Sequence, residues 1–378
     1  MNLEEHAAKP LLAAAGIRIP EGRLVTSAEE AAGAAAAVGK VVVKAQVPAG
    51  KRGKAGGIRP ASTAGEAREA ANAILGRTIG GHVVERLLVE AQAPVASEMY
   101  AAVLNDAESR SPLVMFSAVG GMDIEDIAAE RPDALRKKTV DVRRGLSPDD
   151  ARKMLEGLGL GDRGHAVAAT LAALYRVYAE NDAELLEINP LAVLDDGGIM
   201  ALDCKFVLDD SAIKRRPELS RRGTPDPLTG LEAAAEALGL RYIELEGDIG
   251  LLANGAGLTM TTMDLISHHG GRPANFLEIG GEAYTKATPA LELLLSNPRI
   301  KSLVVNFCGA FARTDVMTEG VVSALETLEP SLPVFFSVHG TGAAEARRLL
   351  KARLGITPHP DMDAAIVAAI DAAGGGKA

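Results

Sequence analysis

The sequence has few aromatic residues and almost no cysteine. Among its 378 residues tryptophan is absent, aromatic residues make up 3%, and there are two cysteines, Cys204 and Cys308. Two cysteines so far apart argue against a disulfide framework or a cysteine-based metal cluster. Hydrophobic residues still amount to 47%, so the core must be built from Ala, Val, Ile and Leu, as in helices packed on sheets.

Long apolar segments and a surplus of positive charge are also missing. No run reaches the roughly 18 apolar residues that indicate a membrane-spanning helix, and the N-terminal MNLEEHAAKP lacks the apolar core of a signal peptide. The formal net charge of −10 argues against nucleic acid or an anionic membrane as a partner. We therefore expect a cytoplasmic protein in which any phosphate site is local, built from a few cations and backbone amides.

The length and the pattern of apolar segments predict two domains that meet between residues 228 and 229. The first, 1–228, mixes helices and strands irregularly and is assigned to the α+β class. The second, 229–378, alternates strands with helices, which indicates an α/β domain with a parallel sheet covered on both faces. Its expected strands are Ile249–Ala253, Phe276–Ile279, Leu303–Phe307 and Val334–Val338. The polar segment 208–239 is interpreted as a connector.

A glycine-rich basic loop follows a buried strand near the N-terminus. The apolar run that begins at Val41 ends with Lys44, and the next loop carries Lys51, Arg52 and Lys54 among glycines. Glycines let the backbone approach a ligand and point N–H groups at it, while the cations add charge. The loop is a candidate polyphosphate site, although a solvated basic loop would have the same composition. It matches neither the Walker nor the dinucleotide-binding pattern.

Oxygen-bearing side chains occur on two apolar segments that flank the Asp195–Gly198 turn. Glu187 and Asn189 lie two positions apart on one expected strand and so share a face. Asp203 is expected on the other strand, Ile199–Phe206. Amide and carboxylate oxygens that converge on one spot would suit Mg²⁺, with ATP phosphates completing the octahedron. A ligand role would also explain carboxylates in strongly apolar surroundings, where an unpaired charge is costly.

Several longer stretches occur in a fixed order along nearly the whole chain. They are MNLEEHAAKPLLAAAGI, VVVKAQVPAGKRGKAGGI, LLVEAQAPVASEMY, GGMDIEDIA, LLEINPLAVL with ALDCK, and NGAGLTMTTMD with HHGGRPANFLEIGG. Together they resemble the β subunit of succinyl-CoA synthetase, an ADP-forming acid–CoA ligase, and the related malate–CoA ligase subunit. The resemblance implies an N-terminal ATP-grasp domain followed by a flavodoxin-like CoA-ligase domain.

The resemblance also implies roles for individual residues. ATP would be bound by Lys44, Lys51, Arg52, Gly53, Glu90, Ala93 and Glu98, with Glu90 at the hinge that holds adenine and ribose. Asn189 and Asp203 would be the Mg²⁺ ligands. Glu187 would be catalytic and face a histidine of a separate α subunit, which also binds most of the CoA. In the second domain Arg313 would be catalytic, at a helix N-terminus that favours phosphate, and the acid would be bound by Asn254, Ala310, Phe311 and Ala312.

The implied reaction makes an acyl-CoA thioester from a small carboxylic acid at the expense of ATP. Phosphate passes through the histidine of the α subunit, an acyl phosphate forms, and CoA displaces phosphate. Because the protein's work in phosphoryl transfer is positioning and charge neutralisation, most of it would fall to Mg²⁺, Lys44 and Arg52. Neither the choice between ATP and GTP nor the subunit stoichiometry follows from the sequence.

The chain departs from the family pattern mainly at the acid end of the implied site. Ala310 and Phe311 occupy a loop in which the family has glycine and aliphatic residues, and Ser337–Gly340 stands where an arginine and a glutamate are usual. Glu282 and Lys51 each replace a glycine. The altered loops affect the acid more than ATP or CoA, so malate or another small carboxylic acid is an alternative to succinate.

Two other kinds of function compete with the ligase subunit. A partner-independent ATP-grasp ligase could join a carboxylate to an amine, but it would not need a parallel-sheet domain with the Asn254 turn. A regulatory paralogue without activity could bind nucleotide, but it would not need the carboxylate of Glu187. We therefore expect an enzyme subunit of the acid–thiol ligase class.

Overall fold

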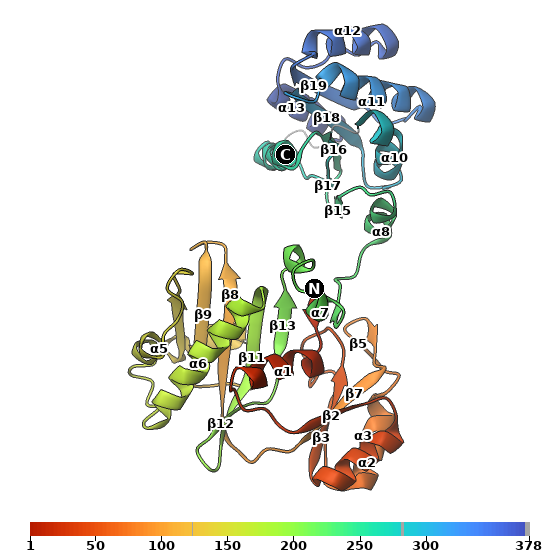
Figure 1. Cartoon of the computed structure of the whole chain (residues 1–378). Helices are drawn as coiled ribbons and strands as arrows, with labels where there is room; N and C mark the ends of the chain where they lie inside the picture. Colours follow the sequence, from red (N-terminus) through yellow and green to blue (C-terminus); the bar gives the residue numbers. More distant parts are fainter. Residues whose placement is uncertain (123, 281–282, 375–378) are drawn as a thin grey trace. The chain divides into compact units, whose positions relative to one another are not determined.

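The computed structural model describes residues 1–122, 124–280 and 283–374, so Glu282 lies outside the described residues. The chain divides into two compact units, Met1–Asp226 and Pro227–Ala378 (Figure 1). The division lies close to the boundary expected between residues 228 and 229. Within the described residues, no helix combines the length and the apolar character needed to cross a bilayer.

The first unit contains a four-stranded antiparallel sheet in the order β2-β7-β3-β4. Its strands are β2 (Gly22–Val25), β7 (Arg86–Ala91), β3 (Val41–Gln46) and β4 (Ile58–Ala61), and its helices are α2 (Ala28–Val38) and α3 (Ala64–Ile74). Each helix starts at a hydroxyl cap, where Ser27 accepts from the Glu30 amide and Thr63 accepts from the Glu66 amide. Both helices pack through buried alanines, which let them approach closely.

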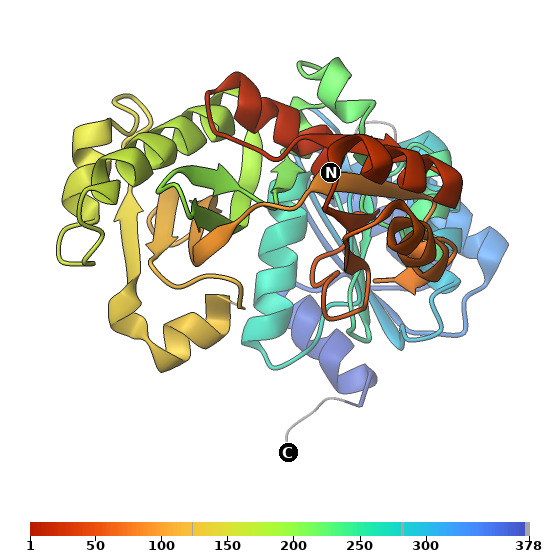
Figure 2. The same cartoon turned by 90° about the horizontal axis from the view of Figure 1, so that it is seen from below.

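The second sheet of this unit has eight strands. They are β10 (Leu135–Thr139), β9 (Ser111–Ser117), β8 (Val95–Asp106), β11 (Ala183–Leu194), β13 (Lys205–Leu208), β1 (Asn2–Leu3) and β14 (Gly223–Thr224) in that order, with β12 (Ile199–Ala201) on β11. The helices α1 (Glu5–Ala14), α5 (Pro148–Met154) and α6 (Arg163–Glu180) add their apolar faces to its core. Both views show the long α6, in yellow-green, along the sheet (Figure 1, Figure 2).

Shorter elements complete the first unit: β5 (Thr78–Ile79), β6 (His82–Val83), α4 (Ile124–Glu130), α7 (Pro217–Ser220) and two 3₁₀ turns, η1 (Pro132–Ala134) and η2 (Asp210–Ala212). The interpretation of 208–239 as a plain connector is therefore wrong. β14 pairs antiparallel with β1 and so joins this segment to the sheet. Farther along, Thr229 and Glu232 form a reciprocal capping box that starts α8 (Gly230–Ala237).

The expected strand Ile199–Phe206 is broken at residues 202–204, so Asp203 lies between β12 and β13 rather than within a strand. Side chains take the place of strand partners here. The Leu202 carbonyl accepts hydrogen bonds from Lys9 Nζ at 2.9 Å and Lys44 Nζ at 2.5 Å. The carboxylate of Asp203 accepts the Cys204 amide at 2.7 Å. Because these groups are satisfied by side chains, the ladder can be interrupted at this point.

The second unit is built on three parallel strands in the order β16 (Ile249–Ala253), β18 (Ser302–Gly309) and β19 (Val334–Gly340). One face of the sheet packs with α9 (Ala256–His268) and α13 (Met362–Ala372), the other with α10 (Ala283–Leu295), α11 (Thr314–Leu328) and α12 (Ala343–Leu354). In β18, Val304 belongs to the first core and its neighbour Val305 to the second. The expected sheet covered on both faces is confirmed.

The remaining expected strand, Phe276–Ile279, does not belong to this parallel sheet, and its bounds differ from those expected. β17 (Asn275–Leu277) pairs antiparallel with β15 (Tyr242–Glu244). The segment 273–278, which contains β17, meets β16 at two isolated parallel bridges, Ile249 with Pro273 and Ala253 with Glu278, and through the buried amide of Asn275. That amide accepts from Leu251 N at 3.0 Å and donates to Leu251 O at 2.9 Å. A side-chain amide thus makes two hydrogen bonds that backbone groups make in a continuous sheet.

Candidate active site

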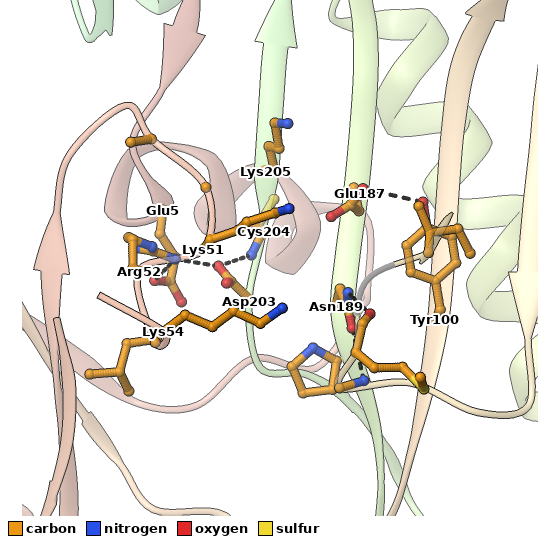
Figure 3. Close-up of a pocket in the computed structure, with 18 of the residues that line it drawn as sticks. Glu5, Lys51, Arg52, Lys54, Tyr100, Glu187, Asn189, Asp203, Cys204 and Lys205 are labelled. Atoms are coloured by element: carbon orange, nitrogen blue, oxygen red, sulfur yellow. Dashed lines mark hydrogen bonds and ion pairs between the residues drawn. The ribbon is translucent and has the colours of Figure 1, made fainter. Parts of the chain in front are cut away.

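A cavity of about 450 Å³ lies in the first unit, between the basic loop 47–54 and the eight-stranded sheet. Its lining brings together most of the residues expected to bind nucleotide and metal, namely Lys51, Arg52, Gly53, Glu98, Glu187, Asn189 and Asp203. Figure 3 shows Lys51 and Lys54 extending from the loop toward the strands. Lys44, Glu90 and Ala93 do not line the cavity. Ala93 lies in the segment 92–94, which joins β7 of one sheet to β8 of the other.

The basic loop is closed onto β3 by its own backbone. The Ala45 and Gly57 amides donate to Gly57 O at 2.7 Å and Arg52 O at 2.8 Å, and Arg52 Nη1 donates to Ala45 O at 2.9 Å. A Cβ at Gly57 would lie 2.6 Å from Ile79 Cδ1, 3.1 Å from Ala45 Cβ and 3.2 Å from Arg52 O, so a side chain there would force these neighbours to shift. Lys51 has a left-handed backbone, with φ of 57°, a conformation that favours glycine. The chain therefore holds a lysine over the cavity at a position with a backbone preference for glycine.

Beside this loop lies a buried cluster of ionic side chains from α1, β3 and β7. Lys44 Nζ is 2.8 Å from Glu5 Oε1 and 2.6 Å from Glu90 Oε2, and Lys9 Nζ is 2.8 Å and 2.6 Å from the same two carboxylates. Arg52 Nη2 is 2.8 Å from Glu5 Oε2. The sequence predicted neither Glu5 nor Lys9 as part of the site. Their spacing of four on one helix was the signal that could have indicated a pair.

The cluster fixes the charge state of its members. Burial alone would raise the pKa of Glu5, but the neighbouring Lys44, Arg52 and Lys9 outweigh burial and hold that pKa well below its usual value. Burial likewise acts to lower the pKa of Lys44, and the carboxylates of Glu5 and Glu90 reverse this and raise it. Glu5 and Lys44 are therefore both charged at neutral pH, and each depends on its partners for compensation.

Glu187 and Asn189 enter the cavity from β11, as their spacing predicted. Between Ile188 and Leu191 the pairing of β11 with β8 shifts register at the cis Asn189–Pro190 bond, opposite Tyr100. Tyr100 Oη donates to Glu187 Oε2 at 3.2 Å. Burial is the main reason that the pKa of Glu187 is raised, and burial followed by the Glu187 charge raises that of Tyr100. Sequence reasoning missed Tyr100.

The loop after β9 closes the cavity between Glu98 and Asn189. The Gly121 amide donates to Asn189 Oδ1 at 2.9 Å, and Asn189 Nδ2 donates to Met122 O at 3.0 Å. A Cβ on Gly121 would lie 1.9 Å from Glu98 Oε2, and its φ is 73°. Only glycine fits so close to Glu98 in this conformation, so the GGMDIEDIA segment has a steric reason for its glycines.

Residues expected to bind the acid gather at the carboxyl ends of the second unit's strands. Asn254, after β16, holds β18 through its amide, which accepts from Cys308 N at 2.8 Å and donates to Cys308 O at 3.0 Å. Arg313 caps α11 and pairs with Asp315 at 2.9 Å. Phe311 is fully exposed, at 105%, on the loop that also carries Ala310 and Ala312. Such edges of parallel sheets are common ligand sites.

Comparison with known proteins agrees with both halves of this description. Residues 2–193 match the family described as ATP-grasp domain, and residues 252–369 match the family described as CoA-ligase. A Thermus thermophilus succinate–CoA ligase [GDP-forming] subunit beta is 43% identical over 355 residues, 93% of this chain and 94% of that protein. The ADP-forming subunit beta of Methylobacillus flagellatus is 41% identical over 361 residues, 93% of each chain.

Among solved structures, ATP citrate lyase from Methanothrix soehngenii, in complex with citrate and coenzyme A, has a TM-score of 0.64 and 25% identity over 98% of this chain and 99% of that chain. The expected order of domains and the resemblance stated from the sequence motifs are thus confirmed. The chain belongs to the succinate–CoA ligase β-subunit family, whose members are subunits of acid–thiol ligases with an ATP-grasp domain followed by a CoA-ligase domain.

Proposed function

We propose that this chain is the nucleotide-binding subunit of an ADP-forming acid–CoA ligase and that it works with an α subunit carrying a phosphorylated histidine and most of the CoA site. The observation that supports this most directly is the cavity in the first unit. Its walls combine a loop with three cations, the carboxylates of Glu187 and Asp203 and the amide of Asn189. Such a set can bind a triphosphate on one side and a metal ion on the other.

In this proposal the phosphates lie against the basic loop, where Lys51, Arg52 and the Gly53 backbone would hold them. Glu98, which also lines the cavity, and the 92–94 segment with Ala93 would border the nucleoside. Lys44 and Glu90 lie outside the cavity lining and are paired in the buried cluster. A phosphate contact by Lys44 would therefore require it to leave Glu5 or Glu90.

Mg²⁺ fits the donor set that Asn189 and Asp203 offer. Both supply hard oxygen atoms, and Mg²⁺ in nucleotide sites is usually held by one or two protein groups with phosphates and water completing its octahedron. No cluster of three or more His, Cys, Asp or Glu side chains suited to a metal occurs in the part of the chain that the structure describes. Bound there, Mg²⁺ would neutralise phosphate charge, while Lys51 and Arg52 orient the nucleotide.

The second unit would provide part of the acid and phosphohistidine site. The N-terminus of α11, with Arg313 at its cap, presents backbone amides that favour phosphate. Asn254 and residues 310–312 lie at the same sheet edge. The side chains of Phe311 and Ala310 are bulkier than the glycine-containing loop of the family and would narrow the acid site, which motivates an acid other than succinate. Malate and other small carboxylic acids are the first candidates.

The test is to purify the chain with its cognate α subunit and to assay thioester formation from CoA and a panel of acids, with ATP and with GTP. We expect turnover only when both subunits are present, with ³²P from the γ-phosphate found on a histidine of the α subunit. Turnover on succinate far above every other acid would remove the alternative acids. Nucleotide consumption by the isolated chain with an acid and an amine would contradict the proposal, as would unchanged turnover in Glu187→Ala.

A further inference from the structure

We propose that Lys205 directly contacts the phosphoryl group while that group passes between the nucleotide and its acceptor, an inference that rests on the proposed function. Lys205 belongs to the ALDCK segment, and it was not among the residues expected to bind a ligand. Its side chain lines the cavity in the first unit. Figure 3 shows it on β13, beside Glu187 on β11 and Tyr100 on β8.

The strand register orders the cavity residues along the sheet. On β11, Ala192 lies opposite Glu98, and Glu187 lies opposite both Ala102 of β8 and Lys205 of β13. Along β11, Asn189 therefore lies between Glu187 and the end of the strand that pairs with Glu98. Asp203 likewise precedes Lys205 by two residues. Two residues along a strand, such as Asn189 and Glu187 on β11, are about 6.6 Å apart, so Glu187 lies more than one phosphate unit farther from the nucleoside than Asn189.

Lys205 therefore lies beyond the proposed metal ligands, on the side away from the nucleoside. Glu187, proposed to face the acceptor histidine, is its direct cross-strand neighbour, and Cβ atoms of such a pair are about 4.5–5.5 Å apart. A group that leaves the metal-bound triphosphate toward an acceptor near Glu187 would therefore come within reach of both side chains. The position of Lys205 is thus that of a group acting on the transfer itself rather than on nucleotide binding.

The charge environment of Lys205 differs from that of the buried cations. Lys9, Lys44 and Arg52 are each held by carboxylates at 2.6–2.8 Å. Lys205 is exposed and makes no hydrogen bond or ion pair with any residue that the structure describes, although its charge acts on Glu187 through space. An ammonium on a flexible stem, with three donors to offer, can follow a moving anionic group.

The chemistry requires such a charge. The bond between the γ-phosphorus and the bridging oxygen breaks, and its electron pair stays on the nucleoside diphosphate. The lone pair of an imidazole nitrogen forms the new bond to phosphorus, and the other ring nitrogen keeps its proton, which the Glu187 carboxylate can accept as a hydrogen bond. Negative charge on the three non-bridging oxygens persists throughout. Lys205 would neutralise part of this charge without gaining or losing a proton.

The alternative is that Lys205 is a solvated lysine that only adjusts the environment of Glu187. The test uses the complete complex of both subunits and compares Lys205→Met and Lys205→Gln with Lys205→Arg, which keeps the charge. Lys214→Met, at an exposed lysine outside the cavity, is the matched control. Two quantities are measured: the dissociation constant of the Mg-nucleotide, and the single-turnover rate of ³²P transfer from saturating γ-labelled nucleotide to the partner's histidine.

We expect both neutral variants to lower the transfer rate by roughly 10²-fold, with little change in the dissociation constant, and Lys205→Arg to restore part of the rate. Lys214→Met should match the unmodified complex. A transfer rate within twofold of the unmodified complex in both neutral variants would overturn the inference. So would a defect confined to nucleotide affinity. If the unmodified complex does not label the partner at all, the proposed function fails instead.

Discussion

Arg52 Nη2 donates a hydrogen bond to Asp203 Oδ1 at 2.6 Å, so a cation of the basic loop is paired with a proposed metal ligand. Arg52 cannot bind a phosphate, and Asp203 cannot bind a metal ion, while both keep this hydrogen bond intact. In the proposed site, binding of the Mg-nucleotide would therefore involve an exchange, in which Arg52 turns to phosphate and Asp203 to the metal.

The exchange predicts opposite effects of Asp203→Asn in the presence and absence of metal. Turnover with Mg-ATP should fall by roughly 10²- to 10³-fold, because a charged metal ligand is lost. ATP in excess EDTA should bind more tightly than to the unmodified chain, since Arg52 has lost one of its two carboxylate partners and keeps only Glu5. Equilibrium dialysis under both conditions measures this. Weaker binding of metal-free ATP by the variant would show that the Arg52–Asp203 pair does not compete with phosphate.

Glu5 is predicted to be a stability residue of the first unit. Glu5→Gln removes the carboxylate shared by Lys9, Lys44 and Arg52, and the unfolding free energy should fall by about 3–5 kcal/mol because buried cations lose compensation. Urea denaturation followed by circular dichroism measures it. Glu29→Gln, at an exposed pair with Arg68, is the control and should have little effect. Equal effects in the two variants would show that the buried cluster is not a net contributor.

The same residue predicts acid sensitivity. In the folded chain Lys44, Arg52 and Lys9 hold the pKa of Glu5 below the ordinary value of a glutamate, so the unfolded chain binds the proton more readily. Its contribution to stability is therefore complete above about pH 4.5 and is lost as the pH falls from there toward the lower folded pKa. Thermal unfolding between pH 6 and pH 3 should show a smaller acid-induced drop for Glu5→Gln than for the unmodified chain. Parallel curves would contradict this.

Tyr100→Phe is predicted to affect phosphoryl transfer more than nucleotide binding. The variant keeps the ring and removes the hydrogen bond to Glu187. A bond to a charged group is worth about 1.5–3 kcal/mol, so the transfer rate should drop by roughly tenfold or more. Rates with saturating nucleotide and the KM for Mg-ATP separate the two effects. Tyr178→Phe is the control, because the hydroxyl of Tyr178 bonds Asn105, outside the cavity lining. A change in KM alone would place Tyr100 in nucleotide binding.

The sequence predicted what depends on local patterns. Apolar runs of strand length identified β16, β18 and β19, and the spacing of Glu187 and Asn189 predicted their common face. Features that depend on contacts between residues distant in the chain could not be predicted from the sequence. The interruption at residues 202–204 depends on Lys9 and Lys44, which arrive from α1 and β3.

The cluster around Glu5 shows the same limit at the site. Lys44 was identified from its place at the end of an apolar strand, but its partners depend on how α1 packs against β3 and β7. No pattern within α1 reveals that contact. The role of Lys205 likewise depends on register, since only the pairing of β13 with β11 places it opposite Glu187.

The amide of Asn275 has a consequence for how the edge of the parallel sheet is specified. Hydrogen bonds between backbone groups form with almost any side chain on the strand, so they do not by themselves select a residue type. The joint between β16 and β17 instead admits one residue type at one position, because only a primary amide of this length can both donate to and accept from Leu251. Exchange of Asn275 to aspartate or leucine would leave at least one backbone group of Leu251 without its hydrogen bond, and β17 would no longer be held in one position against β16.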